Sequence, residues 1–403
     1  MTRPLDGIRV LDWTIFQQGP VAGMMLADMG ADVIKIEDRV TGDPARGMMK
    51  LLGVMASVGG RNAYFEFNNR GKRSLTLDLR KPQARELLYR LVEKSDVFLH
   101  NHRRDFAQKL QLDYQHLSKI NPKLIYATAS GWGPKGPEAS EGSFDYTGQA
   151  KAGFFSTVEE GMPPSYNYAG GPGDQMGGII TAYGVLGALL ARERFGIGQE
   201  LDGSLLSGLM WLQGLGLAFV LLTGKELRHT PRVEAGNPLW NHYKCKEGTY
   251  LALAHLQPDK FWPNVCKALG VEHLQNDPKF ANMMDRGKNS KELIAIFDKV
   301  FATKTRDEWI RICRQNGVIV APVNALADLV NDEQVLANEF ITTFNHPAWG
   351  PVKLPANPVV YSKTPLAITR EAPEFGQHTE EILSEVLSMN WEQISKLKEQ
   401  EVI

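Results

Sequence analysis

One acidic residue stands in a setting that could support chemistry. Asp174 follows the run Gly170-Gly171-Pro172-Gly173 and opens a helix that we predict from about Gln175 to Arg194. Because glycine has no side chain, a large ligand can approach the backbone closely beside this carboxylate. The free amides and positive dipole end of a helix also keep a carboxylate ionised. The pattern fits a catalytic carboxylate, and it equally fits an ordinary helix N-cap, a common position for aspartate.

Other polar residues gather where an anion could be held. Asp145, in Gly142-Ser143-Phe144-Asp145-Tyr146, follows a segment rich in glycine, proline and serine, and taken alone it is an ordinary turn former. Basic residues lie near the ends of predicted strands, where open parallel sheets bind their ligands. Several cations there suit a ligand with several phosphates, although a solvated surface is the plainer interpretation of each one alone. They are Arg39, Lys72, Arg73, Arg80, Arg103, Arg104 and Lys109.

Several familiar chemistries lack their sequence patterns. The chain has no GxxxxGK[ST] phosphate loop, no HExxH and no GxSxG. The spacing of Gly171, Gly173 and Gly177 is one residue too long for a dinucleotide fingerprint, and Asp174 would repel a pyrophosphate there. His100 and His102 are the one close histidine pair, in a predicted strand and without a third ligand, so we expect no metal site. With 45 basic and 46 acidic residues, the net charge of −1 gives no support for nucleic-acid binding.

The elements that must position these residues alternate between strand and helix. A buried strand at 8–13, a helix at 21–29 and a strand at 33–37 form a βαβ unit, which implies a parallel sheet. A helix at 82–94 has its leucines on one face. Further strands are predicted at 74–79, 96–100 and 124–129. The sequence therefore predicts an α/β fold.

The length of 403 residues predicts two domains. We place a large domain at 1–224, a smaller α+β domain at 225–325, and a C-terminal part at 326–403 that returns to the large domain. The predicted elements of the second half are a strand at 250–254 and helices at 258–269, 290–301, 306–316 and 379–388.

Location and association follow from three further features. The N-terminus has no apolar segment of signal-peptide length. The 19 residues 205–223 carry no charge, and we interpret them as a helix buried in the core or in a subunit interface rather than as a membrane span. Cys245, Cys266 and Cys313 are odd in number and widely spaced, which favours buried thiols in a reducing cytoplasm over disulfides or a metal cluster.

A series of short motifs runs through nearly the whole chain. They are Pro4–Asp12, Gln17-x-Gly19-Pro20, Gly30–Glu37, Gly42-Asp43-Pro44, Asn69–Ser74, Gly131–Pro137, Phe144-Asp145-Tyr146 and Gly376–Thr379. Taken together and in this order, they resemble the motifs of the class III CoA-transferases, the family of formyl-CoA transferase, carnitine CoA-transferase and the 2-methylacyl-CoA racemases.

The resemblance implies a site and a mechanism. Asp174 matches the family's nucleophile and would carry an aspartyl-CoA thioester, with Gln17 and nearby amides holding the oxyanion and Asp145 orienting groups near the acyl carbon. The implied CoA contacts are Gln17, Arg39, Leu77, Arg80, Asn101, His102, Arg103 and Lys109. It also implies a Rossmann-like large domain built from both chain ends and an interlocked homodimer, with a heteromer as the alternative. An acyl-CoA and a carboxylic acid would be the substrates, without a permanently bound cofactor, a metal, nucleic acid or a membrane as partner.

Departures from the family pattern bear on the substrate. Asp38 stands where formyl-CoA transferase has arginine, His102 replaces a common phenylalanine, and the small-domain region 236–240 lacks that enzyme's glycine-rich loop. The stretches 144–147 and 243–246 are more similar to transferases for hydroxy-, branched or aryl-substituted acids. A racemase remains the nearest alternative, but its branch has a histidine where this chain has Phe144. A noncatalytic CoA-binding subunit is the third.

Overall fold

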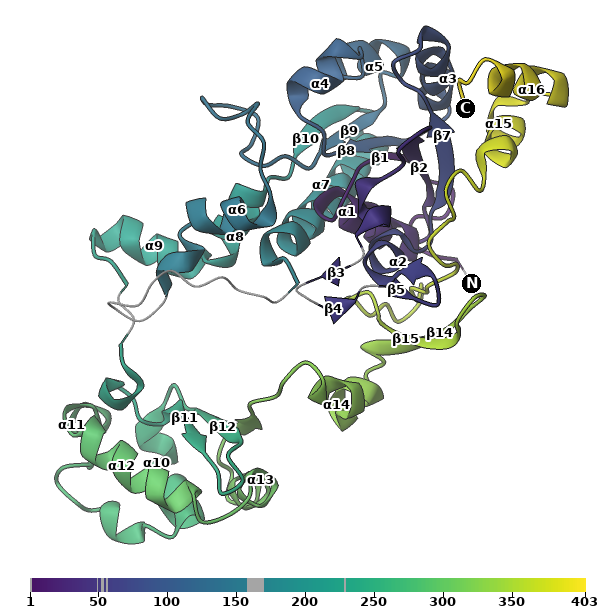
Figure 1. Cartoon of the computed structure of the whole chain (residues 1–403). Coiled ribbons are helices and arrows are strands. Elements are labelled where there is room, and N and C mark those ends of the chain that lie inside the picture. The colour runs from purple at the N-terminus through teal and green to yellow at the C-terminus, as the bar shows by residue number, and fades with distance from the viewer. Residues whose placement is uncertain (1, 49, 52–53, 56, 158–169, 228–229) are drawn as a thin grey trace. The chain divides into compact units, whose positions relative to one another are not determined.

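The structure, a computed structural model, describes residues 2–403 except 49, 52–53, 56, 158–169 and 228–229 (Figure 1). The chain divides into two compact units. The described residues of the first fall within 1–156, 164–227 and 338–403, so this unit uses both ends of the chain. Those of the second fall almost entirely within 228–337.

A six-stranded parallel sheet forms the centre of the first unit, with the strand order β10-β9-β8-β1-β2-β7. From β1 the chain adds strands in one direction through β2 and β7, then returns to β1 and adds β8, β9 and β10 in the other. The order therefore reverses between β1 and β8, which is where open parallel sheets form their ligand crevice. The strands are β1 (Arg9–Trp13), β2 (Asp32–Asp38), β7 (Arg73–Leu77), β8 (Val97–His100), β9 (Ile125–Thr128) and β10 (Gln199–Asp202).

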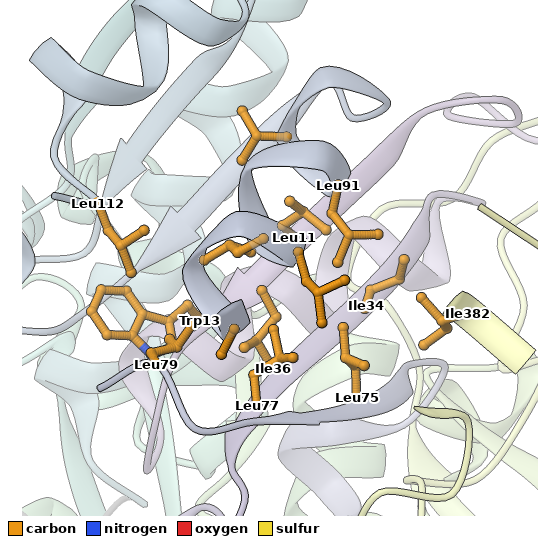
Figure 2. Packing of buried hydrophobic residues seen from close by; sticks show 14 of the residues in the cluster. Leu11, Trp13, Ile34, Ile36, Leu75, Leu77, Leu79, Leu91, Leu112 and Ile382 are labelled. Atoms are coloured by element: carbon orange, nitrogen blue, oxygen red, sulfur yellow. The ribbon is translucent and has the colours of Figure 1, made fainter. Parts of the chain in front are cut away.

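Helices cover both faces of this sheet. Successive strand side chains point to opposite faces, so Val10 packs in one buried cluster with α1 (Gln18–Asp28) and α7 (Pro172–Phe195), while Leu11 packs in another. Figure 2 shows this second cluster, in which Ile382 of the C-terminal part lies with Leu11, Ile34 and Leu75. The helices that contribute to it are α3 (Pro82–Glu93), α4 (Arg104–Lys109), α5 (Tyr114–Ile120), α15 (Thr379–Leu387) and α16 (Trp391–Glu399). The predicted α/β fold built from both chain ends is confirmed.

Smaller elements complete the first unit. A short helix, α2 (Ala63–Asn69), follows the β2 region, and α6 (Asp145–Lys151) precedes α7. Near the C-terminal part, β14 (Ile341–His346) and β15 (Gly350–Pro355) form a hairpin. The remaining pieces are η1 (Pro44–Gly47), β3 (Lys50–Leu51), β4 (Val54–Met55), β5 (Ser57–Val58), β6 (Arg61–Asn62), η2 (Phe154–Thr157), α8 (Leu205–Leu212) and α9 (Gly214–Thr223).

The second unit is an antiparallel three-stranded sheet with helices. Its strand order is β11-β12-β13, and its core joins Tyr243 of the sheet to Phe297 and Trp309 of the helices. The elements are η3 (Arg232–Glu234), β11 (Trp240–Lys244), β12 (Tyr250–Ala254), α10 (Pro258–Leu269), η4 (Glu272–Leu274), α11 (Met283–Lys288), α12 (Ser290–Phe301), α13 (Arg306–Gln315), β13 (Val320–Pro322), η5 (Asp328–Asn331) and α14 (Glu333–Ala337). Cys245, Cys266 and Cys313 are buried free thiols here.

The uncharged stretch 205–223 differs from its prediction. It is two helices, α8 and α9, that meet at 78°. Leu205 and Leu209 of α8 are buried, but no residue of α9 is fully buried, so the prediction that the stretch lies in the core is wrong for α9, and burial in a subunit interface stays a prediction. No single helix among the described residues is long and apolar enough to cross a membrane; only this bent pair qualifies, by length and composition.

Helices α1 and α7 cross at glycines. A Cβ on Gly178 would lie 2.6 Å from Val21 Cγ1 and 2.8 Å from the Gln18 carbonyl oxygen, which is too close for real atoms. We expect Gly178→Ala to lower the free energy of unfolding by about 1–3 kcal/mol, because the helices must separate. Gly187→Ala, in the same helix with nothing within 4 Å, should raise it by about 0.5–1 kcal/mol. Denaturant unfolding of both variants measures this, and equal effects would contradict the close contact.

Candidate active site

The turn between β1 and α1 presents Gln17 at the carboxyl edge of the sheet. Phe16 adopts a left-handed backbone with φ of 62°, which is uncommon for a residue with a side chain. Gln17 is then nearly buried, and its Nε2 donates to the carbonyl of Gly170 at 2.7 Å. The Tyr64 hydroxyl donates to Gln17 Oε1 at 3.3 Å. Gln17 therefore links the β1–α1 turn to the loop that precedes α7.

Asp174 lies in the first turn of α7, but it is not the N-cap. Gly171, with φ of 76°, occupies the N-cap position and Pro172 begins the helix. The capping acceptor is instead Asp145, whose Oδ1 accepts from the amides of Gly173 at 2.7 Å and Asp174 at 3.3 Å. The N-cap interpretation of Asp174 is therefore wrong. A different carboxylate serves these amides, and the Asp174 side chain lines a pocket.

Burial and one neighbouring acid control the protonation of Asp174. Burial, reinforced by the negative charge of Asp145, raises the pKa of Asp174 to about 7. Both effects disfavour the charged carboxylate, against the helix dipole that favours it. Asp174 also acts on Tyr64: burial and the charge of Asp174 raise the pKa of its phenol, which stays protonated and can donate. Near neutral pH, Asp174 is thus balanced between acid and carboxylate.

Two pockets lie at the carboxyl edge of the sheet. The first, of about 250 Å³, is lined by Asp174, Gln17 and Phe144 together with residues that follow β8. The second, of about 330 Å³, lies at the ends of β1, β2 and β7, with Asp38 and Arg80 in its wall. Ile15 and His102 line both pockets. The two pockets are therefore neighbours in the crevice where the strand order reverses.

The predicted CoA contacts divide into groups. Leu77, Arg80 and His102 line the second pocket, and Gln17, Asn101, His102 and Arg103 line the first. Arg39 and Lys109 line neither. The guanidinium of Arg39 donates to the carbonyl of Ile403 at 3.0 Å and lies 3.5 Å from Glu401, while the ammonium of Lys109 is highly exposed.

Two of these residues have structural partners. Asn101 donates to the Ile15 carbonyl at 2.8 Å and accepts from the Ile15 amide at 2.9 Å, so its amide group holds the turn. His102 lies beyond the end of β8 and packs on Trp13 with ring centroids 4.1 Å apart. Burial lowers the pKa of His102 to about 4, so this ring is neutral and aromatic in character. Among the described residues, no group of three or more histidines, cysteines or acids could hold a metal ion.

Comparison with known proteins shows the family to which the chain belongs. A profile of CoA-transferase family III matches residues 5–379. The chain belongs to CoA-transferase family III. The transferase is 30% identical over 403 residues to the (R)-2-hydroxy-4-methylpentanoate CoA-transferase of Clostridioides difficile, covering 99% of each chain. It is 31% identical over 392 residues to the cinnamoyl-CoA:phenyllactate CoA-transferase of Clostridium sporogenes, covering 96% of this chain and 94% of that one.

Solved structures agree with this assignment. The crystal structure of a CaiB/BaiF family protein from Brucella suis matches with a TM-score of 0.83 and 29% identity, covering 96% of this chain and all of that one. The predicted family and the predicted enzyme class, a CoA-transferase, are confirmed.

The structure of the transferase adds site residues that the sequence interpretation missed. Tyr64 reaches Gln17 from α2, and no local pattern around it indicates this role, because the contact depends on how α2 packs. Arg104 was noted only as one of several cations. It lines the first pocket and pairs with Glu200 at 3.0 Å and Asp202 at 2.7 Å. Its acidic partners come from β10, a strand that was not predicted.

Asp145→Ala tests the cap of α7 in the transferase. We expect the free energy of unfolding to fall by about 1–2 kcal/mol, because the amides of Gly173 and Asp174 lose their acceptor. The pKa of Asp174 should also fall, since a neighbouring negative charge is removed. Denaturant unfolding across a pH series measures both effects. Unchanged stability would show that Asp145 does not cap this helix.

Proposed function

We propose that this transferase moves CoA from an acyl-CoA donor to a carboxylic acid through a covalent thioester on Asp174. The observation that carries the proposal is that two neighbouring carboxylates have different roles. Asp145 satisfies the helix amides, while Asp174 lines the pocket beside Gln17 with its pKa raised to about 7. A strongly perturbed carboxylate in a cleft is a candidate for catalysis.

The proposed reaction proceeds by exchanges at carbonyl carbon. An Asp174 carboxylate oxygen attacks the thioester carbonyl of the donor. The C–S bond breaks, CoA departs as its thiolate, and a mixed anhydride forms between the donor acid and Asp174. The thiolate attacks the aspartyl carbonyl carbon, which releases the donor acid and forms aspartyl-CoA. The acceptor carboxylate then attacks this thioester, and the released thiolate attacks the acceptor's carbonyl, which regenerates Asp174. No net proton, electron or ATP is needed, because donor, carrier and acceptor are all carboxylic acids.

The groups around Asp174 suit this chemistry. Each attack creates an oxyanion, and donors aimed at that oxygen stabilise it. Gln17 Nε2 carries two hydrogens, of which one bonds the Gly170 carbonyl and the other remains for an oxyanion. The raised pKa makes Asp174 a stronger nucleophile than an ordinary carboxylate while half of it is still ionised near pH 7.

The two pockets support a path for CoA. We place the nucleotide end in the second pocket, against Leu77 and Arg80, and the thioester end in the first, beside Asp174. His102 lines both, so its neutral ring would lie along the pantetheine. Arg103 contributes positive charge at the first pocket. Arg39 and Lys109 would contact phosphates only outside these two pockets.

For the acid substrate we propose a chemical class, and for the assembly a homodimer. Phe16 and Phe144 form an aromatic edge contact at the first pocket, with ring centroids 6.0 Å apart, which suits a branched, hydroxy- or aryl-substituted acid. The relatives named for 2-hydroxy-4-methylpentanoate and phenyllactate support this class. The apolar α9, in which Leu215, Leu221 and Leu222 are largely exposed, supports a homodimer in which a partner subunit covers it.

Trapping during turnover tests the proposal. The transferase is incubated with an acyl-CoA and treated with borohydride, and peptide mass spectrometry is expected to find homoserine at position 174. A panel of carboxylic acids, with mass spectrometry of the CoA products, then identifies the acceptor. The racemase alternative predicts exchange of the C2 hydrogen with solvent deuterium and no trapped residue, and a noncatalytic subunit predicts neither.

A further inference from the structure

The turn that carries Gln17 is held by side chains rather than by neighbouring backbone. The Thr14 carbonyl accepts from Lys35 Nζ at 2.9 Å, both polar groups of Ile15 bond Asn101, and the Phe16 amide donates to Asp43 Oδ1 at 3.1 Å. Three side chains from three other segments thus fix three consecutive residues. Because Phe16 has a left-handed backbone, which costs on the order of 1 kcal/mol or more, the turn needs such support.

Asp43 contributes to this support in two directions. Besides the Phe16 amide, its Oδ1 accepts from the Ala45 amide at 2.9 Å and so caps η1. Its own amide donates to Glu37 Oε2 at 3.1 Å, which ties the loop after β2 to that strand. Asp43 therefore connects the turn that precedes Gln17 to the loop that follows β2.

Lys35 completes the unit from the middle of β2. Its Nζ lies 2.8 Å from Asp43 Oδ2, and both side chains are fully buried. Two charges are removed from water here, and such a pair is often no more stable than two well-packed apolar residues. Lys35 Nζ also reaches the Thr14 carbonyl, so the pair spans the turn from its first residue to its third.

We propose that the Lys35–Asp43 ion pair is a positioning unit for Gln17. By fixing Thr14 and Phe16, it sets the direction in which Gln17 leaves the turn towards Gly170 and Asp174. Neither Lys35 nor Asp43 touches the proposed reacting atoms; they act through Gln17. The inference rests on the proposed transferase function, in which Gln17 holds an oxyanion.

Asp43→Asn and Lys35→Met test the pair. The Asp43→Asn side chain keeps an oxygen for the Phe16 amide but leaves Lys35 unpaired, and we expect kcat for CoA transfer to fall on the order of 10- to 100-fold, as for a misplaced catalytic group. Asp43 lines the second pocket, but its carboxylate is fully buried and bonded to Lys35 and to the Phe16 and Ala45 amides, so the KM for acyl-CoA should change less than about threefold. The double variant Lys35→Met/Asp43→Asn removes both charges of this pair, so it leaves neither partner as an uncompensated charge and should fold even where a single variant does not.

Asp28→Asn is the matched control. Asp28 forms a buried ion pair with Arg70 at 2.8 Å, but at the opposite end of α1 from the turn. Its loss should destabilise the protein without lowering kcat. A stable double variant at positions 35 and 43 with wild-type kcat, or an equal fall in kcat for Asp28→Asn, would overturn the proposal.

A double-mutant cycle with Gln17→Ala separates positioning from a general defect. If the pair acts through Gln17, Asp43→Asn should lower kcat less than about threefold further in the Gln17→Ala background, whereas independent effects would multiply. Full multiplication overturns the proposal.

Hydrogen exchange of the peptide that contains residues 14–18 supplies a readout without activity. The Ile15 and Phe16 amides should lose protection in the variants at 35 and 43 but not in Asp28→Asn. Failure of the transferase function itself is seen separately, as absence of CoA transfer in the unmodified enzyme or retained transfer in Asp174→Ala. Unchanged exchange in the variants overturns the positioning unit alone.

Discussion

Asp174→Ala is expected to lower kcat for CoA transfer on the order of 10⁴-fold or more, because the carboxylate proposed as the covalent carrier is removed. Asp145 is bonded elsewhere, because its Oδ1 accepts from the amides of Gly173 and Asp174 and its Oδ2 accepts from Gln149 at 2.6 Å. Steady-state assays with the acyl-CoA and acid identified by the panel measure the loss, and borohydride should no longer trap a CoA thioester.

The binding of CoA should survive this substitution. The proposed CoA contacts lie elsewhere in the two pockets, so the dissociation constant measured by calorimetry should change less than about threefold. Asp307→Ala is the control, since Asp307 also lies in the first turn of a helix, α13, but in the second unit. An Asp174→Ala enzyme with more than about a tenth of the normal kcat would disprove the role of this residue.

The pH dependence is expected to be steep on the acid side. Only the ionised carboxylate is a nucleophile, and the pKa of Asp174 is raised to about 7 by burial and by Asp145. The value of kcat/KM for the acyl-CoA should therefore fall about tenfold for each pH unit below 7 and level off above it. Initial rates from pH 5 to pH 9 measure the profile. An enzyme that stays fully active down to pH 5 would contradict a raised pKa.

The raised pKa of Asp174 should also affect stability: the free energy of unfolding should fall as pH rises, whereas activity should rise. The pKa of Asp174 is near 3.8 in the unfolded chain and about 7 in the folded one, so between these values the folded state holds a proton that the unfolded state has released. As pH rises through this window, the contribution of Asp174 to the free energy of unfolding decreases. Asp174→Asn should thus be more stable than the unmodified enzyme at pH 8, on the order of 1–3 kcal/mol, and equal to it near pH 4.

The framework of the fold could be predicted from the sequence because its strands and helices carry strong local patterns. Apolar runs predicted five of the six strands of the main sheet, and α10 and α12 begin and end where predicted. β10 was missed because its sequence, Gln-Glu-Leu-Asp, belongs to a half-exposed edge strand without an apolar run. α16 and the β14–β15 hairpin, whose residues are mostly exposed or half-exposed, were missed as well.

The site could be predicted less completely from the sequence than the fold, because its geometry depends on contacts between distant segments. Asp174 could be found from its glycines and its helix, but the residue that caps that helix lies 28 positions earlier in the chain. Asn101 was predicted as a ligand contact, whereas its amide holds Ile15 across 86 positions. A resemblance transfers residue identities, but only the packed structure shows which of them are occupied by other partners.

The walls of the first pocket differ in how they are built, and this bears on how new acid specificities arise. Gln17 directly precedes α1 and Asp174 lies in α7, and these two helices pack so closely at glycines that an added methyl group would clash. Ala139, Glu141 and Phe144 also line the pocket, and they belong to a loop whose side chains largely face water. Loops of this kind tolerate replacement far better than packed helices. We therefore expect a change in the accepted acid to need substitutions in this loop alone, with Gln17 and Asp174 unchanged.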